Sequence, residues 1–230
     1  MSMKIGFVDL EELKNSINNQ TILVSIMFAN NEIGTIQPIK EISKITREAG
    51  VLFHTDCVQA VGNVRINVEE YGIDLLSMSA HKFYGPKGVG ALYVKKDVEF
   101  ERIQDGGHQE RNKRAGTENV AGIVGLGKAI QIADYNLENY NSKLIKLRNY
   151  FVREITGKYE NVKINGDLKQ RLPGNINVSF PGVDGEELLL KLDGYGICAS
   201  AGSACSSGSS NPSHVLAAIG LDDIYSRRFT

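Results

Sequence analysis

Short apolar runs alternate with helical or long connecting segments in the first part of the chain, and this alternation constrains the fold most strongly. The run TILVSIMF at 21–28 is continuously apolar and rich in β-branched residues, as expected of a strand buried on both faces. A helix is expected between Pro38 and the stop at Gly50. Further strands are expected at 51–56, 74–79 and 90–95. This order predicts an α/β fold with a parallel-rich sheet.

The rest of the chain predicts a second, smaller domain. We expect a long helix over 119–156 and a shorter helix over 185–193. Short strands are expected at 162–164, 175–180 and 196–199. We place the boundary inside or at the end of the long helix. Residues 1–136 then form a large domain, and residues 137–230 form a smaller α+β domain.

Composition excludes several classes of function. The formal net charge is -1, so no overall field favours nucleic acid. No apolar run approaches the ~20 residues needed to cross a bilayer, and the N-terminus has no signal-peptide pattern. The three cysteines have the spacing of neither a disulfide framework nor a zinc site. We therefore expect no metal, no membrane and a reducing, cytoplasmic location.

Polar residues gather where the predicted strands end. Asn30 and Asn31 follow the first strand, Asp56 ends the second, and Ser79 ends the third. Open α/β sheets bind ligands at the carboxyl ends of their strands. The pattern predicts a ligand site at this edge of the sheet.

Lys82 lies directly after the third predicted strand and before the glycine-rich FYGPKGVG. A lone lysine there would be a solvated loop charge, but Asp56 closes a neighbouring strand. A pyridoxal 5'-phosphate (PLP) site needs a lysine amine for a Schiff base and a carboxylate at the pyridine nitrogen. Two unit charges ~4 Å apart are worth about 4 kcal/mol at an effective dielectric near 20, enough to keep that nitrogen protonated. Lys82 and Asp56 therefore predict a PLP site.

The segments HTDCVQA and SMSAHKFYGPKGVGALYV, in this order, resemble the PLP segment of the NifS/IscS-type cysteine desulfurases. These enzymes belong to the class-V aminotransferase group of fold type I. The resemblance extends over essentially the whole chain. It implies a PLP-dependent transferase fold of type I, PLP as cofactor, L-cysteine as substrate and a homodimer.

The resemblance also implies the roles of individual residues. Lys82 would carry the cofactor, and Asp56 would pair with the pyridine nitrogen. Asn31 and Gln59 would contact the ring hydroxyl of the cofactor. Ser79 and His81 would bind its phosphate, and Thr117 would bind the phosphate of the cofactor in the other subunit. Taken singly, Asn31 is equally well a helix cap and Gln59 an exposed helix residue. We expect the residues of one subunit to converge on one pocket.

Cys205 lies in the small-residue segment ASAGSACSSGSS at 199–210. Such a segment is usually just a flexible loop. The six residues from Ala199 to Cys205 span at most ~20 Å, enough to carry sulfur from a buried cofactor to the surface. The family nucleophile lies in this motif, which makes Cys205 the predicted persulfide carrier. Its thiol needs a proton acceptor, for which His108 is a candidate, although a histidine in a glycine-rich loop is more often structural.

The other two cysteines, Cys57 and Cys198, are interpreted as packing residues. At the end of the printed sequence, Arg228 matches the family arginine that binds the substrate carboxylate, a bidentate task suited to a guanidinium. Asn31 is also expected in the substrate site.

Members of the family extend beyond both ends of this sequence. The helix whose N-terminus cups the phosphate and the histidine that stacks on the ring have no counterpart here, as in a shortened, degraded or split protein. We therefore expect this chain alone to bind PLP weakly. We also expect it to self-associate through an unpaired strand edge at 21–28 or 90–95.

Three functions are consistent with these motifs. The first is a cysteine desulfurase that passes sulfur through Cys205 to an acceptor such as an iron–sulfur scaffold. The second is a selenocysteine lyase or another class-V PLP enzyme. Transamination needs no cysteine loop, so Cys205 argues against it, whereas selenocysteine cleavage makes similar demands on the site. The third is an inactive fragment that acts only as a binding remnant.

Overall fold

The computed structural model describes residues 5–200 and 213–221. Cys205 and Arg228 lie outside this part of the chain, so their predicted roles stay predictions. Residue contacts divide the chain into two compact units. The first, here called the sheet unit, comprises Lys14–Phe28 and Ile39–Glu138, and the second unit comprises Met1–Leu13, Ala29–Pro38 and Asn139–Thr230. Ala29–Pro38 thus groups with the C-terminal residues, and the predicted domain division at residue 136 stays a prediction.

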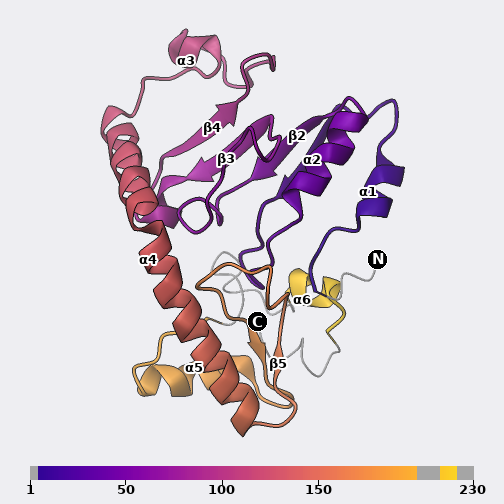
Figure 1. Ribbon diagram of the computed structural model, residues 1–230. Coiled ribbons are helices and arrows are strands. Elements are labelled where there is room, and N and C mark those ends of the chain that lie inside the picture. The colour runs from indigo at the N-terminus through magenta and orange to yellow at the C-terminus, as the bar shows by residue number, and fades with distance from the viewer. Residues whose placement is uncertain (1–4, 201–212, 222–230) are drawn as a thin grey trace. The chain divides into compact units, whose positions relative to one another are not determined.

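Four strands form the sheet of the first unit: β1 (Leu23–Met27), β2 (Leu52–Asp56), β3 (Leu75–Ser79) and β4 (Gly90–Val94). Their order is β1-β2-β3-β4, and Figure 1 labels the last three of them. The first three strands are parallel, and β4 is antiparallel to β3. A short connection such as the one between β3 and β4 permits only an antiparallel neighbour, since a parallel one needs a crossover. The predicted α/β class with a parallel-rich sheet is confirmed.

One face of the sheet carries the core of this unit. Val24, Phe53 and Leu76 are buried on it, and α2 (Ile39–Glu48) packs against β2 with Ile39 and Ile42 inward. The apolar side chains on the other face of β1 and β2 are partly exposed: Leu23 at 43%, Met27 at 40% and Leu52 at 36%. The expectation that the 21–28 strand is buried on both faces is therefore wrong within the described residues, because no described helix of this unit covers that second face.

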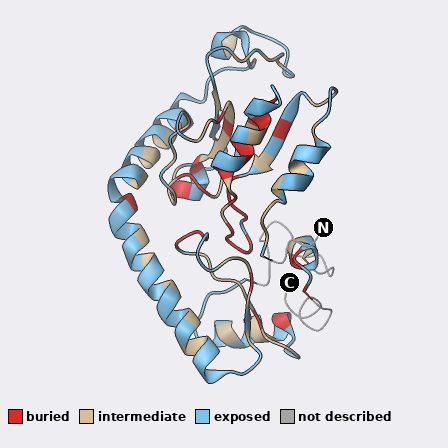
Figure 2. Cartoon of the chain, turned by 45° about the vertical axis from the view of Figure 1, so that its right-hand side comes forward, coloured by how far each residue is buried: buried red, intermediate tan, exposed pale blue. Residues whose placement is uncertain are grey.

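The longest helix, α4 (Val120–Lys158), confirms the predicted helical segment. Only Gly122 and Leu137 along it are buried, and Figure 2 shows most of its surface in the colour of exposed residues. None of the described helices is both long enough and apolar enough to cross a membrane.

The remaining elements are short. They are α1 (Leu10–Ser16), η1 (Ala80–Phe83), α3 (Gln109–Asn112), β5 (Lys163–Ile164), β6 (Val178–Ser179), α5 (Gly185–Gly194) and α6 (His214–Ala218). In the second unit β5 pairs antiparallel with β6. The predicted strands at 162–164 and 175–180 are thus present but shorter than expected.

The predicted strand at 196–199 is wrong. Gly196 has a φ of +72°, and its N–H donates to the Asp193 carbonyl at 2.8 Å. The next N–H, that of Ile197, donates to the Leu192 carbonyl at 2.9 Å. These two groups close the C-terminus of α5, as in a glycine-terminated helix cap, and are not available for a strand ladder.

Candidate active site

Asp56 is the last residue of β2, and its carboxylate is exposed at the carboxyl end of the strand. One carboxylate oxygen accepts a hydrogen bond from the Val58 N–H at 2.8 Å. The Asp56 carbonyl accepts one from the Phe28 N–H at 2.8 Å, which joins it to the end of β1. These two bonds fix the backbone around Asp56, and no described residue donates a hydrogen bond to its second carboxylate oxygen.

The neighbouring strand β3 leads into the turn that bears Lys82. Ala80 and Phe83, the first and last residues of the turn η1 (Ala80–Phe83), are buried, and Lys82 between them is exposed. The Ala80 carbonyl accepts the Gly85 N–H at 2.9 Å, and a Cβ on Gly85 would lie only 2.9 Å from that oxygen. Glycine is therefore needed for the chain to turn back so closely behind Lys82.

Ser79 and His81 lie at the start of the same turn. The Ser79 hydroxyl and the His81 Nδ1 form a hydrogen bond of 2.9 Å. Register pairs Asp56 with Ser77, so Ser79 lies two residues, about 7 Å, further along the strand direction. Asp56, Ser79, His81 and Lys82 therefore leave the sheet at the carboxyl end of adjacent parallel strands.

Among the described residues, no ion pair within 4.0 Å joins the Lys82 amine to Asp56 or to any other acid. In pyridoxal the aldehyde carbon and the ring nitrogen are opposite each other, so their two protein partners must stand on either side of the ring. The residues present supply an amine, a carboxylate, a hydroxyl and an imidazole. These four groups, at the carboxyl ends of two adjacent strands, fit the needs of a PLP site.

Gln59 and Thr117, two further residues of the predicted site, also belong to the sheet unit. Gln59 is half-buried in the turn that follows β2, and its carbonyl accepts from the Asn63 amide at 3.1 Å. Thr117 is exposed, two residues after buried Ala115. His108 bonds through Nδ1 to Asn112 Oδ1 at 3.0 Å, which supports its structural interpretation. The contacts of Gln59 and Thr117 with a cofactor stay predictions.

Asn31 belongs to the second unit, so its convergence with the residues of the sheet unit also stays a prediction. Its side chain is exposed, although Ala29, Asn30, Glu32 and Ile33 around it are buried. Sequence reasoning missed the residues that hold this turn. They come from the segment that contains Asn175, where the repeated asparagines of GNIN were the available signal.

The two described cysteines differ. Cys57 is fully buried, and burial raises the pKa of its thiol to about 12, with the Thr55 hydroxyl opposing this shift. Cys57 is therefore a packing residue, as predicted. Cys198 is exposed and follows the helix cap, so its interpretation as a packing residue is wrong.

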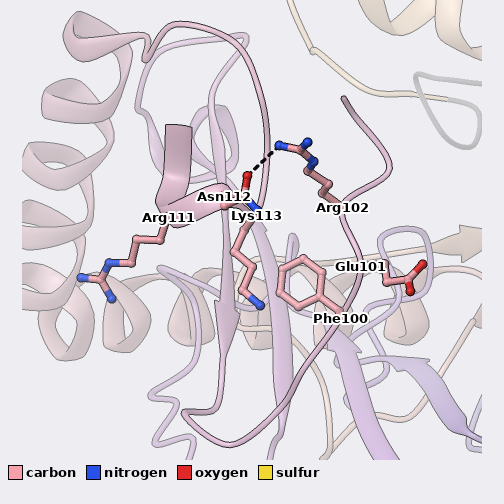
Figure 3. Close-up of a pocket in the computed structure, with 6 residues that line it drawn as sticks. All are labelled: Phe100, Glu101, Arg102, Arg111, Asn112 and Lys113. Atoms are coloured by element: carbon pink, nitrogen blue, oxygen red, sulfur yellow. Dashed lines mark hydrogen bonds between the residues drawn. The ribbon is translucent and has the colours of Figure 1, made fainter. Parts of the chain in front are cut away.

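A pocket in the sheet unit lies outside the predicted site. This pocket of about 380 Å³ is lined by Phe100, Glu101, Arg102, Arg111, Asn112 and Lys113. Figure 3 shows the Lys113 amine beside the Phe100 ring, 4.6 Å from its centroid, while the Arg111 guanidinium points away. Arg102 donates to Asn112 Oδ1 at 2.7 Å and pairs with Asp105 at 3.2 Å. Arg102 and Lys113 therefore interact mainly with residues of the same loop.

The chain is similar to known proteins over most of its length. The family model described as Aminotransferase class-V matches residues 2–223. A cysteine desulfurase IscS of Clostridium botulinum is 59% identical over 218 residues, which are 94% of this chain and 55% of that protein. A cysteine desulfurase IscS of Dictyoglomus turgidum is 56% identical over 216 residues, 94% of this chain and 55% of its own. The chain thus spans about half the length of the curated relatives it matches.

Solved structures show the same fold. A NifS-like protein superposes with a TM-score of 0.87 at 39% identity, over 98% of this chain and 59% of that one. The NifS-like protein of Rickettsia africae gives 0.87 at 35% identity, over 98% of this chain and 60% of that one. The fold is that of PLP-dependent enzymes of fold type I. Within that class, the chain belongs to the aminotransferase class-V family.

Proposed function

We propose that this chain is the part of a PLP-dependent cysteine desulfurase that carries the cofactor lysine and the sulfur-accepting cysteine. The observation that carries the proposal is the placement of Lys82 and Asp56 at the carboxyl ends of adjacent parallel strands. The relatives named cysteine desulfurase support the choice of reaction, and a similar solved protein, SspA, is described in complex with cysteine.

When bound, PLP supplies an electron sink for the α-carbon of an amino acid. The Lys82 amine holds the cofactor and, once displaced by substrate, removes the α-proton. The Asp56 carboxylate keeps the ring nitrogen protonated, and Ser79 and His81 donate hydrogen bonds to the phosphate. Asp56, His81 and Lys82 are exposed, and Ser79 is half-buried, at the carboxyl ends of β2 and β3 or in the turn after β3.

Cys205 provides the second half of the chemistry. Its thiolate attacks the sulfur of L-cysteine, so an S–S bond forms as the C–S bond breaks. The electron pair goes to the carbon, which is protonated to give L-alanine. Arg228 and Asn31 bind the substrate, and Thr117 serves the phosphate of a partner subunit in a homodimer. The persulfide on Cys205 then passes to an acceptor such as an iron–sulfur scaffold in the cytoplasm.

The experiment starts with the 230-residue chain mixed with PLP. Borohydride reduction and peptide mass spectrometry locate the lysine that has formed a Schiff base. We expect the label on Lys82 and its loss in Lys82→Ala. Lys87→Ala, an exposed lysine in the same glycine-rich segment, is the matched control and should keep the label. Label spread evenly over both lysines would contradict the proposal.

The reaction is followed by adding L-cysteine and measuring alanine and protein persulfide. We expect equal amounts of both in the first turnover. Alanine without persulfide, or pyruvate instead of alanine, would contradict the desulfurase assignment. A faster reaction with selenocysteine and none with cysteine would favour the lyase instead.

A further inference from the structure

Asn31 lies at the tip of a closed turn in the second unit. Ala29 and Ile36 form an antiparallel bridge at its base. Inside the turn, Asn30 Oδ1 accepts from the Glu32 N–H at 2.9 Å and from the Ile33 N–H at 3.0 Å. The Asn31 side chain is exposed, while its neighbours Asn30 and Glu32 are buried.

The turn is held from outside by Asn175. Its Nδ2 donates to the Asn31 carbonyl at 3.3 Å and to the Glu32 carbonyl at 3.0 Å. Because carbonyl oxygens only accept, the amide must face them with its nitrogen. Its buried oxygen finds no hydrogen-bond partner among the described residues. Gly34 leaves room for it, since a Cβ there would lie 2.4 Å from Asn175 Oδ1.

Asn177 provides a natural comparison two residues further along. It is half-buried like Asn175, and its Nδ2 donates to the Glu32 carbonyl at 3.3 Å. None of its hydrogen bonds reaches the Asn31 carbonyl. Of these two neighbouring asparagines, Asn175 alone contacts the peptide unit that bears the Asn31 side chain.

Buried Arg171 fixes the segment from which Asn175 projects. Its guanidinium donates to the backbone carbonyls of Asp167, Asn165 and Asn175, the first at 2.8 Å. Backbone bonds join this segment to the turn, since the Leu172 N–H donates to the Gly34 carbonyl at 2.9 Å. Asn175 is therefore presented from a rigid base.

We propose that Asn175 is a positioning residue for Asn31, which it holds at the tip of the turn through two backbone carbonyls. The inference rests on the proposed function in so far as Asn31 contacts cofactor or substrate. Asn175 itself touches neither in this role.

The first test needs no cofactor. Asn175→Asp keeps the shape of the side chain but replaces its donor with an acceptor. We expect the Glu32, Ile33 and Gly34 amides to exchange hydrogen about tenfold faster, which corresponds to about 1.4 kcal/mol. Amides of β2 should be unchanged. The matched control, Asn177→Asp, loses one donor bond and should change the exchange of these amides by less than about threefold.

The second test uses the chain loaded with PLP. Asn31→Ala should shift the pH dependence of the absorbance of the Lys82-bound cofactor. Asn175→Asp should shift it in the same direction, and the double variant should show no additional shift, because both changes act on one contact. Asn175→Ala, which removes the donor without adding charge, should behave likewise.

Unchanged turn exchange in Asn175→Asp would overturn the inference. So would a spectral shift in Asn31→Ala that is absent from both Asn175 variants. Global unfolding of both Asn175 variants while Asn177→Asp folds would assign Asn175 to stability instead and would also overturn it. If no variant forms a lysine-bound cofactor, the proposed function fails, and the exchange measurement still decides the role of Asn175.

Discussion

At the scale of single residues, burial separates the cysteines by reactivity. The Cys57 thiol is enclosed beside Thr55, and its pKa is raised from 9.0 to about 12, mainly by desolvation. Cys198 is exposed. A thiol reagent at neutral pH therefore discriminates between them, because only the accessible thiolate reacts.

The Cys57 pKa makes stability depend on pH. Between pH 9 and 12 the unfolded chain releases the thiol proton that the folded chain keeps, so the free energy of unfolding falls as pH rises. We expect a loss of about 1.4 kcal/mol for each pH unit in this window. Urea unfolding of the chain and of Cys57→Ala at about pH 8 and about pH 10 isolates this contribution. The same pH dependence in both proteins would show that Cys57 does not titrate this way.

Cys205 lies outside the described residues, so its predicted role as sulfur carrier is tested by substitution and a persulfide assay. Replacing it with serine should abolish protein persulfide, since a hydroxyl does not accept sulfane sulfur. The link between Lys82 and the cofactor should remain. The matched variant Cys198→Ser, at the exposed cysteine, should retain persulfide formation. If the persulfide persists in Cys205→Ser and disappears in Cys198→Ser, the nucleophile is Cys198 and the assignment of Cys205 is wrong.

At the scale of elements, β1 and β4 each have one paired neighbour in the described sheet. No other described strand pairs with their outer edges, and Leu23 and Leu92 nearby are exposed. Such an edge is a template for pairing with another chain. This arrangement supports the expectation of self-association at 21–28 or 90–95.

A charge on the edge strand tests this expectation. Leu23→Lys should lower the mass measured by light scattering toward that of one chain, because an edge lysine opposes strand addition. Leu190→Lys places the same charge at an exposed leucine within the helix α5 and should leave the mass unchanged. Equal effects of both changes would indicate a general effect of charge on solubility.

At the scale of the whole molecule, each compact unit has its own buried side chains. Phe53, 0% exposed, lies in the sheet unit, and Leu216, 2% exposed, packs with Ile33 and Ile219 in the second. Phe53→Ala should cost about 3–5 kcal/mol and Leu216→Ala about 2–5 kcal/mol. The rate of amide hydrogen exchange should increase more in the unit that carries the substitution than in the other unit. Faster exchange throughout both units after either change would show that they unfold together.

The sequence by itself determined the α/β class, four strands of the sheet and the residues at their carboxyl ends. Apolar runs of strand length are local signals, and the polar residues that follow them mark the strand ends. The lysine turn was equally readable, because Gly85 and the buried neighbours of Lys82 are adjacent in sequence. Asp56 and Lys82 lie at the same edge of the sheet because β2 and β3 are parallel, so their carboxyl ends are at the same side.

Only the tertiary structure decided which face of the sheet is covered, that 196–199 caps a helix, and that Ala29–Pro38 belongs with the C-terminal unit. It also decided which asparagine holds Asn31. Asn175 lies 144 residues away in the chain, and its hydrogen bond to Asn31 leaves no periodicity or spacing in the sequence. Local preference sets the elements, but burial and long-range hydrogen bonds depend on which segments meet in space.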